Sequence, residues 1–121
     1  MRILDIIPQD KYKKLLTNGI CQRNALAKKK VLDFKPVIRL FTPDANASWL
    51  LSELDPDDPD SAYGVCDPGL GYPKLEWVQF EELDLVRGPM GLPIELDPSF
   101  IANKTDRAYW EEADLEGKIV L

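Results

Sequence analysis

Residues 48–80, SWLLSELDPDDPDSAYGVCDPGLGYPKLEWVQF, contain three apolar stretches separated by two loops rich in Pro, Gly and Asp. The stretches 48–54, 62–66 and 75–80 carry the aromatic and aliphatic residues that favour strands. Polar and apolar side chains alternate in 75–80, as they do in a half-buried strand. The loops are too short for a crossover helix, so neighbouring strands should pair antiparallel. These residues therefore predict an antiparallel β-meander.

The segments before the meander predict one further strand and at least one helix. Residues 36–42 contain VIRLF, which is typical of a strand, and residues 8–18 place apolar side chains at helical spacing. Asn18 and Gly19 both tolerate the left-handed conformation that ends helices, so the sequence predicts that this helix stops there. Residues 21–30 fit either a second short helix or an irregular basic connector.

After the meander, shorter elements follow. The sequence predicts a helix over 81–87, strands at 94–96 and 100–102, and a last helix over 106–114. The prolines of DPDDPD at 55–60 lack the N–H groups of a strand ladder, so an irregular turn is expected there. The chain is thus expected to form a single α+β domain, residues 1–121. It has an N-terminal helix, a central antiparallel β-meander of about four to six strands and short helices after it.

Composition excludes several kinds of chemistry. None of the 121 residues is His, which removes Ser-His-Asp and Cys-His nucleophiles and His-ligated zinc. Cys21 and Cys66 are too few for a disulfide scaffold; we expect two buried thiols and leave their pairing open. No apolar run approaches the ~18 residues of a membrane span, and no signal peptide is evident. We expect a cytoplasmic protein without a cofactor. Trp49, Trp77 and Trp110 are expected in the core.

Charge is unevenly distributed along the chain. Residues 1–39 hold ten Lys or Arg and three acidic residues, whereas residues 40–73 hold seven acidic residues and no basic one. The basic arm Lys28, Lys29 and Lys30 could contact nucleic-acid phosphates, although few aromatic residues accompany it. A solvated face is the simpler interpretation of this arm. The candidate acidic binding surface comprises Asp44, Glu53, Asp55, Asp57, Asp58 and Asp60.

The same acids suggest alternatives that the sequence alone does not separate. A calcium loop counted from Asp55 would need Gly and Glu where Asp60 and Cys66 stand, so that motif fails and no metal ligands are predicted. A solvated turn, a docking surface and a metal-dependent hydrolase or nuclease remain. Glu53 and Glu76 could also project into one cleft as a carboxylate pair, although exposed side chains are the simpler expectation.

A family resemblance covers most of the chain. Residues 40–83, and within them TPDANASWLLSELDP at 42–56, resemble a family of small acidic bacterial proteins classed as a domain of unknown function. RGPMGLPIELDPSF at 87–100 and LLTNG at 15–19 are similar to it as well. The resemblance implies a setting on plasmids, phages and integrative elements, and it assigns no catalytic residue.

The combined hypothesis is a non-enzymatic interaction protein of a mobile genetic element. Its acidic surface would bind a basic protein of the host or of the element, in counter-defence or as an accessory in DNA transfer. The alternatives are a metal-dependent hydrolase or nuclease built from the clustered carboxylates, and a nucleic-acid accessory protein that uses Lys28–Lys30. The oligomeric state stays open.

Overall fold

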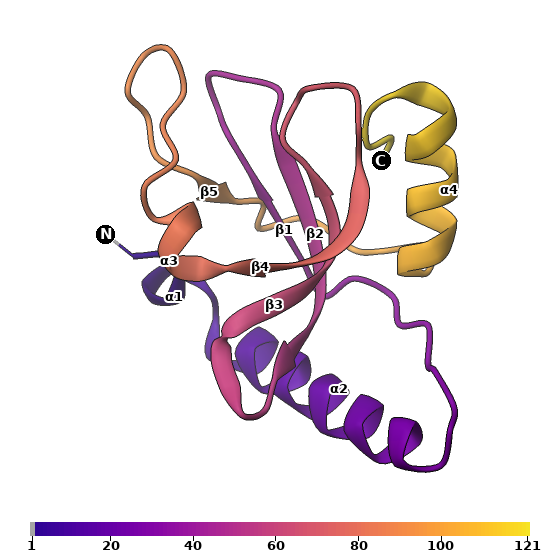
Figure 1. Ribbon diagram of the computed structural model, residues 1–121. Helices are drawn as coiled ribbons and strands as arrows, with labels where there is room; N and C mark the ends of the chain where they lie inside the picture. Colours follow the sequence, from indigo (N-terminus) through magenta and orange to yellow (C-terminus); the bar gives the residue numbers. More distant parts are fainter. Residues whose placement is uncertain (1) are drawn as a thin grey trace.

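Five strands form one antiparallel sheet in the order β4-β3-β2-β1-β5 (Figure 1). The computed structural model describes residues 2–121. The architecture confirms the α+β prediction and the strands expected around 36–42, 48–54, 62–66, 75–80 and 94–96. The strands are β1 (Ile38–Phe41), β2 (Ser48–Asp55), β3 (Asp58–Asp67), β4 (Lys74–Gln79) and β5 (Glu95–Leu96).

Four helices flank the sheet, and two apolar clusters lie on its two faces. β2 is the central strand, and residues 48–54 are all buried because helices cover both of its faces. Leu51 belongs to the cluster under α1, α2 and α3, whereas Leu50 packs with Tyr109 of α4. The helices are α1 (Ile3–Ile6), α2 (Gln9–Ala27), α3 (Phe80–Leu83) and α4 (Asp106–Glu116).

In the middle of the β2–β3 ladder, β2 contains one extra residue relative to β3. Leu51 pairs with Gly64, but the next pair along the ladder joins Glu53 to Tyr63, so Ser52 is the bulged residue. In a regular strand alternate side chains share a face, yet Leu51 and Leu54, three positions apart, enter the same core. The bulge therefore turns both Ser52 and Glu53 away from that core and toward one cavity.

The helix end expected at Asn18 and Gly19 is wrong, because α2 continues to Ala27. The Asn18 side-chain amide is buried and donates a hydrogen bond to the carbonyl of Ser52 (2.8 Å). Gly19 lies against β2 so closely that a Cβ atom would stand 1.8 Å from the Leu54 carbonyl oxygen. Both residues therefore serve the contact between α2 and the bulge rather than the end of a helix.

The turn expected over 55–60 is also shorter than predicted. Asp55 of β2 pairs with Asp58 of β3, so the hairpin turns within Pro56 and Asp57. The Asp57 N–H donates to the Asp55 carboxylate (2.9 Å), an Asx-type bond that holds this turn. β3 can include Pro59 because this end of the strand is exposed.

Three smaller expectations are wrong as well. Residues 100–102 form no strand, although Phe100 and Ala102 pack on the α4 side of the sheet. Trp77 is 49% exposed rather than in the core, whereas Trp49 is buried. Cys21 is exposed, and both Cys21 and the buried Cys66 are free thiols. The exposed Trp77 matters because it borders the cavity described below.

Substitution Gly19→Ala should destabilise the protein, although alanine is the better helix former. Helix propensity alone predicts a gain of about 0.8–1.0 kcal/mol for Gly→Ala. We expect instead a loss of about 1–3 kcal/mol in the free energy of unfolding, because the new methyl group collides with the β2 backbone. Urea unfolding followed by circular dichroism measures the free energy of unfolding of the unmodified protein and of the variant.

Asn24→Ala, at an exposed position of the same helix, serves as the control and should leave stability unchanged or slightly raised. A stabilised Gly19→Ala protein would contradict the close contact between α2 and β2.

Candidate functional site

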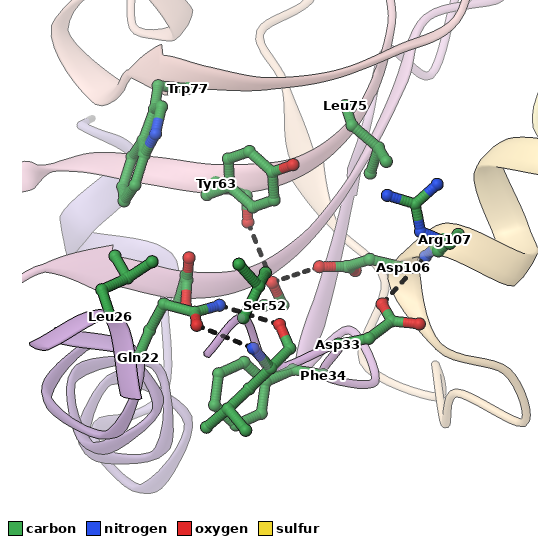
Figure 2. A pocket seen from close by; sticks show the side chains of 13 residues that line it. Gln22, Leu26, Asp33, Phe34, Ser52, Tyr63, Leu75, Trp77, Asp106 and Arg107 are labelled. Carbon is green, nitrogen blue, oxygen red and sulfur yellow. Dashed lines mark hydrogen bonds between the residues drawn. The ribbon is translucent and has the colours of Figure 1, made fainter. Parts of the chain in front are cut away.

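A cavity of about 210 Å³ lies where the C-terminal half of α2, residues 31–34, the β2–β4 sheet and the start of α4 meet (Figure 2). Its position follows from the bulge, which directs Ser52 and Glu53 to this side of β2. Asp106, the first residue of α4, joins them from the other wall. Two buried carboxyl groups distant in sequence, Glu53 and Asp106, thus line one cavity.

Ser52 and Asp106 form the polar part of the cavity floor. The Ser52 hydroxyl lies 3.2 Å from the Tyr63 carbonyl oxygen and is also hydrogen-bonded to the Asp106 carboxyl group (Figure 2). The Ser52 hydroxyl donates the bond to Asp106, and this bond favours the ionised carboxylate. Burial outweighs that effect and raises the pKa of Asp106 to about 7, assisted by the charges of Asp33 and Glu53.

Glu53 is the second buried acid, with 3% of its surface exposed. Burial raises the pKa of its carboxyl group to about 7, and a bond from the Gln22 side chain offsets part of the rise. Within residues 2–121, neither Glu53 Oε2 nor Asp106 Oδ1 has a hydrogen-bond partner. Buried polar atoms are normally paired, so these two oxygens are unsatisfied acceptors on residues that line the cavity.

The cavity walls are apolar and aromatic. Leu26, Val31 and Leu32 line the cavity and are exposed to solvent. Tyr63 and Trp77 lie side by side on β3 and β4, with ring centroids 5.3 Å apart. Exposed apolar side chains around a polar floor are typical of a site that covers a ligand.

A second cavity of about 250 Å³ continues the first along α2. Gln22, Leu26, Glu53 and Trp77 line both cavities. We call the combined depression, bounded by the residues of the two cavities, the α2 groove. Its far end is formed by Arg23, Leu54, Asp55, Pro56 and Asp57 together with Gly19.

The structure divides the six acids of the predicted surface among several environments. Glu53 lies in the groove, and Asp55 and Asp57 lie at its end, where the Arg23 guanidinium contacts both (3.9 and 2.6 Å). Asp58 accepts hydrogen bonds from Ser61 and Gln79, and Asp60 is exposed.

Asp44 lies apart from the other five acids. Its carboxylate accepts a hydrogen bond from the Met90 N–H (2.7 Å) in the loop after α3. The basic arm Lys28–Lys30 is exposed directly after α2, outside the residues that line the groove. The predicted acids therefore do not all lie together: Asp44 is separate from the β2–β3 hairpin, and Glu53, Asp55 and Asp57 line the groove.

Sequence reasoning missed Asp106, Ser52 and Tyr63 as site residues. The sequence predicts Asp106 only as the first residue of the last helix, and Glu76, the candidate partner of Glu53, is exposed and lines neither cavity. One signal was present, because Ser52 and Glu53 are adjacent polar residues inside the apolar stretch WLLSEL. A polar pair in a central strand indicates either a bulge or a functional cavity.

Residues 2–121 contain neither a metal-ligand cluster nor a membrane-spanning helix. Nowhere in this part of the chain do three acidic or thiol groups come together closely enough to hold a metal ion. No helix in it is long and apolar enough to cross a membrane.

Residues 6–120 match the family described as "Protein of unknown function (DUF2958)". The chain belongs to this family. The match spans both the LLTNG segment of α2 and the β2 bulge, so the residues that build the groove lie within the family domain. Comparison with curated proteins and with solved structures gives no match.

The two buried carboxyl groups should make stability depend on pH. A carboxyl group with a pKa of about 7 in the folded protein and 4.5 as its ordinary value binds its proton more tightly when folded. The stabilisation that this tighter proton binding gives the folded state is complete below pH 4.5 and is lost as the pH rises through 7. It amounts to ~1.4 kcal/mol for each unit by which the folded and ordinary pKa values differ. Glu53→Gln should therefore flatten the fall in unfolding free energy between these pH values.

Chemical denaturation at a series of pH values measures this slope. Glu76→Gln removes an exposed carboxylate from the same sheet and should keep the slope of the unmodified protein. Parallel curves for the unmodified protein and Glu53→Gln would contradict a raised pKa at Glu53.

Proposed function

We propose that this protein is a non-enzymatic interaction protein that binds a basic segment of another protein in the α2 groove. The observation that supports this most is the pair of buried carboxyl groups, Glu53 and Asp106, each with one oxygen free of protein partners within the described chain. A buried polar atom left without a partner costs about 1–3 kcal/mol, which a cationic donor from a ligand would recover.

The charges around the groove favour a cationic ligand. Its walls carry five acids and two arginines. The chain as a whole has a net charge of −6, which would attract a basic partner at long range. The charged residues lining the groove are Asp33, Glu53, Asp55, Asp57 and Asp106 together with Arg23 and Arg107.

The partner proposed is a protein of the host or of a mobile genetic element that carries this gene. Counter-defence and an accessory role in DNA transfer are the activities that such an element would require. The two alternatives drawn from the sequence lack comparable support: no metal-ligand cluster occurs in residues 2–121, and the Lys28–Lys30 arm stands outside both cavities. We therefore place the binding surface at the groove.

A fluorescent peptide of alternating basic residues and glycines provides the direct test. We expect saturable binding of this peptide, measured by fluorescence anisotropy. The double variant Glu53→Gln/Asp106→Asn should lose at least tenfold in affinity, because both carboxyl groups become neutral amides and their charge-assisted bonds to the peptide are lost. The control Glu81→Gln/Glu82→Gln removes two exposed carboxylates from α3, outside the groove, and should bind as the unmodified protein does.

Two results would overturn the proposal. One is the absence of peptide binding, and the other is an equal loss of affinity in the two double variants, which would indicate attraction by net charge alone. Binding of a single-stranded oligonucleotide that falls steeply with salt and disappears when Lys28–Lys30 are changed to Gln would support the nucleic-acid alternative instead.

A further inference from the structure

We propose that the cavity at Glu53 and Asp106 receives an arginine side chain of the partner; this inference rests on the proposed function and names the anchoring residue. The first argument is the placement of the acceptors. Glu53 Oε2 comes from β2 and Asp106 Oδ1 from the start of α4, so a ligand must present donors to two separate walls. A guanidinium group carries five N–H donors in a fixed plane and can serve both walls at once.

The second argument is the mixture of surfaces around these acceptors. Leu26, Val31 and Leu32 offer apolar surface to the methylene stem of an arginine. The half-exposed Trp77 and the neighbouring Tyr63 offer aromatic surface, on which a guanidinium stacks favourably. The cavity thus offers apolar surface to the methylene stem of an arginine and aromatic surface to its guanidinium group.

The third argument comes from the chain's own arginines. Arg39 lies with its guanidinium carbon 4.6 Å from the centre of the Phe41 ring while it donates to Asp97 (3.1 Å). At the far end of the groove, Arg23 lies between two carboxylates, Asp55 and Asp57. Both arrangements show how a guanidinium is held in this protein, and the cavity offers aromatic rings together with Glu53 and Asp106, which form no salt bridge within residues 2–121.

Lysine fits the cavity less well. An ammonium group is more strongly hydrated than a guanidinium and presents its donors from a single point, so its burial between two walls costs more. The cation already present, Arg107, does not fill the role, because Figure 2 shows its guanidinium directed toward Leu75 rather than toward Asp106. A bound guanidinium would also favour the ionised carboxyl groups, so binding should release protons near pH 7.

The test is an NMR titration of the whole protein with three small probes at millimolar concentration: Nα-acetyl-arginine amide, its lysine counterpart and its citrulline counterpart. Citrulline keeps the shape of arginine without the charge. We expect saturable shifts of the Trp77 indole N–H with the arginine probe, at least tenfold weaker binding of the lysine probe and none of the citrulline probe. Affinity for the arginine probe should fall as the pH is lowered below 7.

The outcomes separate this inference from the proposed function. Equal affinity for the arginine and lysine probes, or undiminished arginine binding by Glu53→Gln/Asp106→Asn, would overturn the arginine pocket. If the basic peptide still binds and loses affinity in Glu53→Gln/Asp106→Asn, the proposed function stands while the arginine pocket fails. If the basic peptide does not bind either, the proposed function and the arginine pocket are both wrong. The comparison of probes on the unmodified protein needs no variant, so it stands even if a variant folds poorly.

Discussion

The contact between α2 and the extra residue of β2 determines both the fold around the sheet centre and the position of the groove. A bulge in a buried strand leaves backbone groups that need partners, and the Asn18 side chain supplies one at the Ser52 carbonyl. Gly19 allows the helix axis to come close enough for that bond. With the bulge fixed, Leu54 returns to the core and Glu53 faces the cavity. Without it, the alternation of the strand would place Glu53 in the apolar core beside Leu51.

The acids of the β2–β3 turn and the acids of the cavity differ in burial and in whether a cation of the protein pairs with them, which a count of charges does not show. Asp55 and Asp57 are already paired with Arg23, and because these groups are substantially exposed, the pair adds little to stability. Glu53 and Asp106 are buried and are not matched by any cation in a salt bridge within residues 2–121. A partner cation would therefore gain more at the cavity, where the dielectric is lower, than at the turn. Of the acids near the groove, Glu53 and Asp106 are therefore the ones from which a partner cation would gain most.

The sequence predicted the sheet well because its signals are local. Alternation in 75–80 places Leu75 and Trp77 on the cavity side and Val78 and Phe80 in the opposite core, as observed. The errors arose where long-range contacts override local preference: Asn18 and Gly19 favour a helix end in isolation, but β2 holds them in a helix. The site could not be found from spacing alone, since Ser52 and Asp106 are separated by 54 positions and meet only through the packing of α4 on the sheet.

The protonation of the cavity follows from the burial of its two acids. Two carboxyl groups in one apolar cavity resist ionisation, because each charge would lose hydration and repel the other. The protein limits this cost by retaining protons, because burial raises the pKa of both carboxyl groups to about 7. A cation that enters the cavity replaces those protons, so binding, ionisation and stability become linked at one site. The bulge that removes Glu53 from the core thus also places it in a cavity where its ionisation would depend on a bound cation.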